Sequence, residues 1–188
     1  MSKPDYIDFQ TRTEPLAYLI TFRCYGTWLH GDKRGSMDRR KHNLYAAPKI
    51  SPNRWLVEAE ETKLLHQPIR LSKTQRRTVE RAIREACNYR RYELFAVNAR
   101  SNHVHSVVGT ISEPERAMNT FKSYATRKLR EAGLLEKGTR PWSRHGSTPY
   151  LWTPEDVEAA INYVINGQDN EPFVRPTPTK RKAKKSSI

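Results

Sequence analysis

The order of its periodic segments constrains the fold of this 188-residue chain more than any other feature. Strand-like runs rich in β-branched and aromatic residues alternate with amphipathic helical runs, in the order β-α-β-β-α-β-α. The strands are expected at 16–25, 94–99, 104–110 and the end of the loop 141–152, and the helices at 72–89, 113–132 and 153–165. This order predicts an α+β fold, a ferredoxin-like split βαβ antiparallel sheet (β-α-β-β-α-β) with an extra C-terminal helix.

Residues typical of helix caps predict where several helices begin or end. The run Ser72–Gln75 has the residues of a capping box and predicts a helix start. The run Thr153–Asp156 combines a capping threonine, a proline in the first turn and two acids, which again predicts a start. Gly133 follows the second predicted helix and is expected to end it.

The chain divides into three expected parts. Residues 1–15 form an N-terminal extension, residues 16–167 form the folded domain, and residues 168–188 form a basic flexible tail rich in Pro, Thr, Lys and Ser. Within the domain, the segment at about 26–71 is an irregular insertion whose one expected helix lies near 55–65. So long an irregular connection in a small domain usually has a function or is mobile.

The charge balance favours a polyanionic partner. The net charge is +14 and the isoelectric point is near 10.0, which suits nucleic acid or an acidic membrane surface. A membrane role is the weaker reading because no apolar run approaches the roughly 18 residues that a bilayer span needs. The N-terminus does not resemble a secretory signal, so we expect a cytoplasmic protein. Cys24 and Cys87 are then expected to be reduced and mostly buried.

The segment Asn102-His103-Val104-His105 carries the first candidate site. Side chains alternate across a strand, so His103 and His105 point to one face and Val104 to the other. Two neighbouring imidazoles can hold a divalent metal and leave coordination positions open, as phosphate chemistry requires. A histidine outside such a context is more often structural. The sequence offers no obvious third ligand.

Tyr124 is the second candidate. On the helix 113–132 it falls about 100° from the centre of the apolar stripe, on its shoulder. A half-buried amphipathic tyrosine is the ordinary interpretation, and delivery of the hydroxyl to a site at the helix–sheet boundary is the functional one. A phenol with a pKa near 10 is a weak nucleophile unless cations lower that pKa. Lys122, Arg127 and Lys128 are the cations available nearby.

These residues resemble a known family. The segment Asn102–His105, followed by Phe121–Leu129, is similar to the single-tyrosine HUH transposases of the insertion-sequence-200 type, and within them to the REP-associated tyrosine transposases. The runs 18–29 and 142–152 resemble segments of the same branch. The resemblance implies that the domain is an HUH transposase-like catalytic domain with a ferredoxin-like fold. It also implies a divalent ion, Mg²⁺ or Mn²⁺, and cleavage of single-stranded DNA at hairpin-bearing sites.

The resemblance further implies roles for single residues. His103 and His105 would be metal ligands, and Tyr124 would form a 5′-phosphotyrosine while releasing a 3′-hydroxyl. The family commonly has Gln or Asn one turn after the tyrosine as a third ligand, whereas this chain has Lys128. The third ligand or its replacement is therefore expected among Lys128, Glu131 and His145.

The expected partner is single-stranded or hairpin DNA, bound by a possible homodimer or by a monomer. The candidate phosphate contacts are the cations that flank the motifs, namely Arg23, Arg100, Lys122, Arg127 and Arg144. Two alternatives stay open. One is a domesticated hairpin-binding protein that does not cleave, and the other is a metal phosphodiesterase in which water attacks the phosphate.

Overall fold

The computed structural model describes residues 13–33, 36–37 and 49–167. The predicted extension 1–15 and the predicted tail 168–188 therefore lie almost wholly outside the described residues. The elements, in chain order, are β1 (Ala17–Cys24), β2 (Ser36–Met37), β3 (Lys49–Ile50), α1 (Arg54–Glu61), α2 (Lys73–Arg90), β4 (Glu93–Ala99), β5 (His103–Gly109), α3 (Pro114–Glu131), β6 (Trp142–Ser147), β7 (Tyr150–Leu151) and α4 (Pro154–Asn166).

The main sheet has five strands and is antiparallel throughout. Its order is β4-β5-β1-β6, with β7 paired to β1 beside β6. β5 therefore lies between β1 and β4, the strand that follows α2. β6, the strand that follows α3, pairs with the other edge of β1. This is the strand order of a split βαβ arrangement. The predicted ferredoxin-like sheet with an extra C-terminal helix is confirmed.

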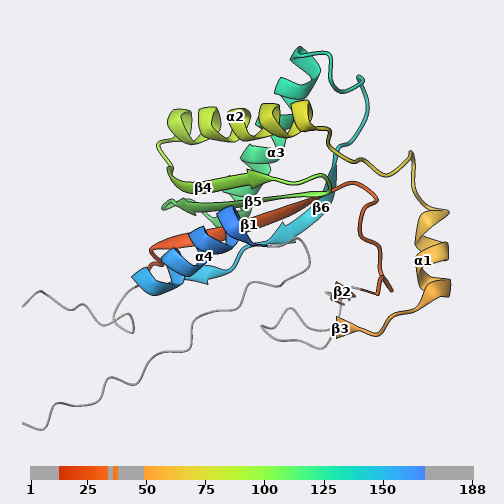
Figure 1. Cartoon of the computed structure of the whole chain (residues 1–188), viewed down its shortest axis with the longest axis horizontal. Helices are drawn as coiled ribbons and strands as arrows, with labels where there is room; N and C mark the ends of the chain where they lie inside the picture. Colours follow the sequence, from red (N-terminus) through yellow and green to blue (C-terminus); the bar gives the residue numbers. More distant parts are fainter. Residues whose placement is uncertain (1–12, 34–35, 38–48, 168–188) are drawn as a thin grey trace, which may run out of the picture.

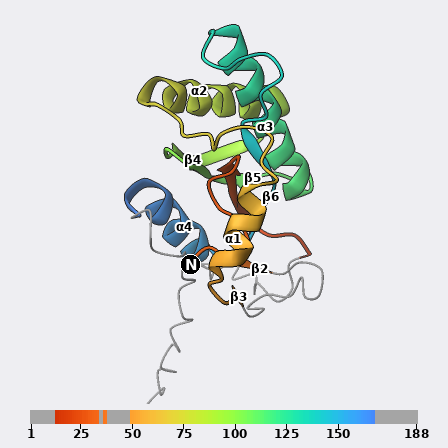
Figure 2. The same ribbon diagram turned by 90° about the vertical axis from the view of Figure 1, so that its right-hand side faces the viewer.

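Helices cover both faces of this sheet. Figures 1 and 2 show α2 and α3 on one face and α4 on the other. The core between the sheet and the α2–α3 layer includes Ile20, Phe22, Val104 and Phe121. A smaller core under α4 is built from Ala17, Leu19, Ala96, Val107, Leu151, Ala160 and Val164. The chain is therefore a three-layer α/β/α structure in which each face of the sheet has its own apolar cover.

The predicted helix caps are present. Ser72 and Gln75 form a reciprocal capping box at the start of α2, and Thr153 and Asp156 form another at the start of α4. Each box satisfies two backbone N–H groups that the first helical turn leaves without a partner. Gly133 has a positive φ of 67°, which suits a glycine directly after the end of α3.

The segment 141–152 differs from its prediction. It forms the strand β6 and the two-residue strand β7, whereas a loop ending in one short strand was expected. β6 is an edge strand with few packed positions, so its sequence shows no apolar alternation from which a strand could be predicted. Gly146 is required there because a Cβ would overlap the backbone carbonyl oxygen of Thr21 on β1 as well as the Met118 side chain of α3.

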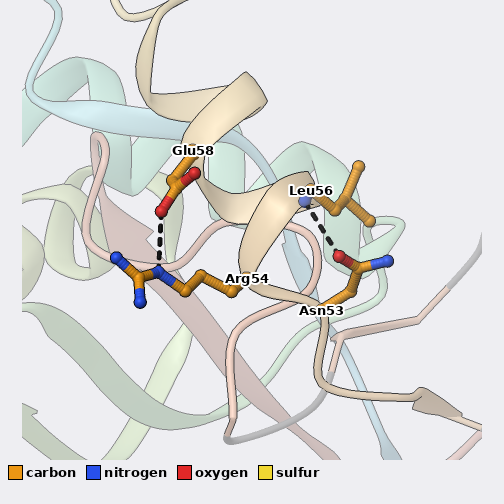
Figure 3. Close-up of polar contacts among 4 residues, drawn as sticks. All are labelled: Asn53, Arg54, Leu56 and Glu58. Atoms are coloured by element: carbon orange, nitrogen blue, oxygen red, sulfur yellow. Dashed lines mark hydrogen bonds and ion pairs between the residues drawn. The ribbon is translucent and has the colours of Figure 1, made fainter.

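In the described part of the insertion, the short helix α1 lies beside the sheet at one end (Figure 1). It has no buried residue, so local contacts stabilise it. The Asn53 side chain accepts a hydrogen bond from the Leu56 amide at 3.1 Å, and Arg54 pairs with Glu58 at 2.7 Å (Figure 3). The prediction of a helix near 55–65 is confirmed, with an earlier end. No helix in the described part of the chain is both long and apolar enough to cross a membrane.

Candidate functional site

Strand alternation places both histidines of β5 on the face that α4 covers. Val107 belongs to the core under α4, whereas Val104 belongs to the core under α2 and α3. His103 and His105 have the parity of Val107 and so lie on the α4 side. Their rings meet edge-on, with centroids 4.4 Å apart and planes at 74°. The predicted pairing of the two imidazoles on one face is therefore present.

Each of these imidazoles is oriented by a hydrogen bond at its Nδ1 atom. His105 Nδ1 lies 2.8 Å from the Thr21 hydroxyl of β1, the residue opposite it in the register. His103 Nδ1 donates to the Asn102 side-chain oxygen at 2.7 Å. Metal-binding histidines characteristically use one ring nitrogen for such a contact and coordinate the ion through the other. The donor set and its supports therefore fit a divalent metal held through the two Nε2 atoms.

The electrostatics keep His105 neutral. Burial, together with the neighbouring His103, Arg100 and Arg23, lowers the pKa of His105 from 6.5 to about 3. A buried imidazole that carried a proton would lose its hydration and face these cations. His105 therefore presents an uncharged ring, the form that ligates a metal, throughout the neutral pH range.

The tyrosine beside this pair comes from α4. The ring of Tyr163 stands edge-on to His105, with centroids 5.1 Å apart and planes at 70°. The last turn of α4 is held to β4: Asn98 Nδ2 donates to the Val164 carbonyl at 2.9 Å, and Arg100 Nη2 donates to the Gly167 carbonyl at 2.8 Å. These contacts fix the turn that carries Tyr163. They also satisfy carbonyls that a helix end leaves without an intrahelical partner.

Tyr124 does not reach the histidines, and the prediction that its hydroxyl faces them is wrong within one chain. α3 packs against the opposite face of the sheet, where Tyr124 borders the large core. Its ring lies 6.4 Å from that of Tyr89, and the guanidinium carbon of Arg127 lies 4.5 Å above it. The position of Tyr124 at the edge of the apolar stripe of α3 was predicted correctly. The face of the sheet that α3 covers was not.

Because α3 lies on the opposite face of the sheet from the histidines, two of the three candidates for a third metal ligand are excluded. Lys128 and Glu131 lie on α3 and are engaged with each other at 3.4 Å, while Lys128 also pairs with Glu85 of α2 at 3.1 Å. These carboxylates raise the pKa of Lys128, which therefore stays a cation and cannot ligate a metal.

His145 lies on the side of the sheet that carries the histidine pair. Its neighbour Gly146 faces Met118 of α3, so alternation turns His145 toward the α4 side, on the strand beyond β1. It does not complete a site, since the described residues contain no group of three His, Cys, Asp or Glu side chains able to hold an ion.

The predicted phosphate contacts separate into two groups. Arg23 is opposite His103 in the register and Arg100 holds the end of α4, so both lie at the histidine face. Arg127 lies on α3 and Arg144 is exposed on β6, away from that pair.

For Lys122 the prediction is wrong. This side chain is only 8% exposed, and its ammonium donates to the carbonyls of Ser143, Arg144 and His145 at 2.9, 3.2 and 3.3 Å. A buried cation spent on three carbonyls of β6 has a structural role and cannot contact a phosphate.

A sequence signal for Tyr163 did exist. Leu19 and Val107 are apolar on the histidine side of their strands, so that face also needs an apolar cover. The helix 154–166 is the amphipathic segment left to supply it, and Tyr163 lies one position before its buried residue Val164. The aromatic hydroxyl nearest the histidines could therefore have been sought on the last helix.

The central part of the chain is similar to a known protein family. Residues 66–154 match the family model described as "Transposase IS200 like". Over this segment, just under half of the chain, the protein is similar to the IS200-like transposases. The segment includes α2, β4, β5, α3 and β6, and so both histidines, whereas most of α4 lies just beyond its end. No curated protein matches the chain significantly.

Two solved structures are similar to it. A REP-associated tyrosine transposase bound to a REP hairpin aligns with a TM-score of 0.46 and 12% identity, over 87% of this chain and 70% of the other. A candidate transposase from Deinococcus radiodurans R1 aligns with a TM-score of 0.42 and 12% identity, over 89% of this chain and 97% of the other. With TM-scores below 0.5, neither likeness bears on the chemistry of this chain.

Proposed function

We propose that this protein is an IS200-like transposase that cleaves and rejoins single-stranded DNA at hairpin-bearing sites, with Tyr163 as the nucleophile. The observation that carries the proposal is the contact of Tyr163 with His105, at 5.1 Å between ring centroids. It brings a phenol to a pair of oriented imidazoles, of which His105 is neutral, on a basic protein. A tyrosine nucleophile needs neighbouring positive charge to lower its pKa, and Arg23 and Arg100 lie on this face.

The proposed reaction is a transesterification. The Tyr163 oxygen loses its proton and forms a bond to phosphorus, and the bond from phosphorus to the 3′-oxygen breaks. The 3′-oxygen takes up a proton, giving a free 3′-hydroxyl and a 5′-phosphotyrosine ester. A second 3′-hydroxyl attacks that ester, which restores the phosphodiester and releases Tyr163. The number of ester bonds is unchanged at every stage, so rejoining needs no external energy source.

A divalent ion, Mg²⁺ or Mn²⁺, is the proposed cofactor. His103 and His105 would hold it, and when bound it supplies Lewis-acid polarisation of a phosphate oxygen. Both histidines and Tyr163 come from one chain, so the proposed site does not depend on a partner subunit. A monomer would then suffice, and the homodimer stays a prediction.

The adduct tests the assignment. A 3′-labelled hairpin oligonucleotide is incubated with the protein and Mn²⁺, then run on a denaturing gel. Wild type and Tyr124→Phe are expected to form a labelled covalent complex, and Tyr163→Phe is expected to form none. A complex that persists in Tyr163→Phe and disappears in Tyr124→Phe would overturn the assignment and favour exchange of α3 between subunits.

A second candidate function is hairpin binding without cleavage. It is favoured by the finding that the described residues supply two imidazoles but no third ligand of the His, Cys, Asp or Glu type. It predicts that wild type retains the hairpin and yields no cut product with either metal. Cut DNA without attached protein would instead indicate that water attacks the phosphate.

A further inference from the structure

Helix α2 exposes a line of arginines along its whole outer side. Arg77, Arg81, Arg84 and Arg91 are all exposed, and the one position between them at the same spacing is the exposed Asn88. Steps of four, three and four residues keep Arg77, Arg81, Arg84 and Asn88 on one side of the helix. Arg91 is the residue directly after the helix end and extends the exposed positive charge there. The buried residues Thr78, Val79, Ala82, Ile83, Ala86 and Cys87 occupy the opposite side. We call the four arginines the arginine ridge.

The acidic residues of α2 do not neutralise the arginine ridge. Glu80 accepts a hydrogen bond from the Ala99 amide at 2.8 Å, at the end of β4. Glu85 pairs with Lys128 of α3 at 3.1 Å. Within the described residues, no ion pair includes an arginine of the ridge. The charges of α2 are therefore sorted: carboxylates point to neighbouring elements and guanidinium groups point to solvent.

This arrangement has a cost for folding. Like charges at spacings of three and four residues, such as Arg77–Arg81 and Arg81–Arg84, destabilise a helix by roughly 0.2–0.5 kcal/mol per pair. A helix that only had to cover the sheet would be more stable with acids interspersed among these positions. The uncompensated ridge is therefore better explained by a partner that carries regularly spaced negative charge.

We propose that the arginine ridge binds the phosphate backbone of double-stranded DNA, the stem of a hairpin, on the face of the molecule opposite His105 and Tyr163. The proposal rests on the proposed function only in taking DNA as the substrate. From Arg77 to the end of α2 at Arg90 the helix rises about 20 Å, at about 1.5 Å per residue. At about 3.4 Å per base pair, this length matches roughly six base pairs of duplex.

Two features favour a duplex over other polyanions. Proteins that hold single strands interleave cations with aromatic side chains on which bases stack. None of positions 77, 81, 84, 88 and 91 is aromatic, and the exposed Tyr89 lies beside Tyr124 of α3 instead. A membrane-binding helix inserts an apolar face, and the apolar face of α2 is buried against the sheet. Guanidinium groups alone suit phosphate contacts that carry no sequence information.

The ridge and the candidate site are separated by a single layer. β4 is an edge strand of the sheet, and it contacts α2 through Glu80 and α4 through Asn98. Figure 2 shows α2 and α4 on either side of it. A strand leaving a duplex held on α2 can therefore pass around the β4 edge to reach Tyr163.

The test compares DNA affinities by fluorescence anisotropy in the absence of divalent metal, so that no cleavage occurs. The ridge variant carries Arg77→Gln, Arg81→Gln, Arg84→Gln and Arg91→Gln. The control variant removes the same charge from exposed positions outside the ridge, by Lys33→Gln, Arg54→Gln, Lys137→Gln and Arg140→Gln. One probe is a hairpin with a ten-base-pair stem and a single-stranded arm, and the other is the arm alone.

The ridge variant is expected to bind the stemmed probe at least tenfold more weakly than wild type and to bind the arm unchanged. Its slope of log affinity against log salt should fall by about 3.6, which is 0.9 for each of four phosphates. The control variant should stay within about threefold of wild type. Equal loss in the two variants, equal loss on the two probes, or an unchanged salt slope would each overturn the proposal.

Failure of the ridge and failure of the nucleophile assignment are distinguishable. The anisotropy assay requires no cleavage, so it decides on the ridge whether or not Tyr163 reacts. Conversely, the covalent adduct on the labelled stemmed probe at saturating protein concentration reports on Tyr163 and should be unchanged in the ridge variant. Far-ultraviolet circular dichroism melts confirm that the variant is folded, as expected for four exposed side chains.

Discussion

The ring of Tyr163 stands edge-on to the ring of His105, with 5.1 Å between their centroids. This contact joins the last described helix to the central part of the sheet, across the face that α2 and α3 leave uncovered. Tyr124 and Tyr163 look equivalent in sequence, since both lie on amphipathic helices, but of the two only Tyr163 makes this contact. The face of the sheet that each helix covers distinguishes them.

Metal binding should depend on the two imidazoles and their hydrogen-bond partners. His103→Ala and His105→Ala are each expected to abolish Mn²⁺ binding measured by titration calorimetry. Thr21→Val keeps the shape of the threonine and removes the hydroxyl that orients His105, so affinity should fall about 10–100-fold. His145→Ala is the matched control and should bind as wild type does. Equal loss in His145→Ala would contradict this and assign His145 as a further ligand.

The contacts at the end of α4 should affect the rate of adduct formation more than DNA affinity. Asn98→Asp keeps the size of the side chain but turns a donor toward the Val164 carbonyl into an acceptor, which displaces the turn that carries Tyr163. We expect the single-turnover rate to fall about tenfold, which corresponds to roughly 1.4 kcal/mol in the barrier. Anisotropy should show unchanged affinity for the DNA arm. Asn119→Asp, an exposed substitution on α3, controls for the added charge.

An equal decrease of rate in Asn98→Asp and Asn119→Asp would contradict the positioning role. Arg100 makes the companion contact to the Gly167 carbonyl. Arg100→Lys keeps the charge but shortens the reach and removes the planar donor group, so it should reproduce part of the rate loss. A loss of DNA affinity with an unchanged rate would instead assign Arg100 to phosphate binding.

Lys122 should be important for stability. Lys122→Met retains the length of the side chain but removes the ammonium that three β6 carbonyls accept hydrogen bonds from. Leaving buried acceptors without donors costs about 1–3 kcal/mol. The melting temperature should fall by several degrees, since about 1 kcal/mol shifts it by roughly 2–4 °C in a protein of this size. Lys137→Met, at an exposed position, should melt as wild type does.

The two cysteines should be unreactive in the native protein. Burial raises the pKa of Cys24 to about 12 and that of Cys87 to about 12, even though Arg70 and Arg84 act in the opposite direction. At pH 8 roughly one thiol in ten thousand is then ionised, and the thiolate is the reactive form. Iodoacetamide at pH 8 should leave both thiols unmodified in buffer and label both in guanidinium chloride. Rapid stoichiometric labelling in buffer would contradict the burial.

The sequence alone determined the local features, because they depend on neighbouring residues. Capping boxes fixed the starts of α2 and α4, and period-two alternation put His103 and His105 on one face. The element order was sufficient for the ferredoxin-like sheet, since a split βαβ pattern allows few topologies. Burial of Cys24 and Cys87 followed from composition and is confirmed.

Only the tertiary structure decided which helix covers which face of the sheet. Alternation indicates that His105 and Val104 point in opposite directions, but it does not indicate which of the two directions meets α3. Packing settled this: Val104 lies in the core with Phe121, and Val107 lies in the core with Val164. As a result Tyr163 faces His105, Tyr124 does not, and Lys122 is committed to β6. These outcomes depend on contacts between residues far apart in the chain, which no local pattern encodes.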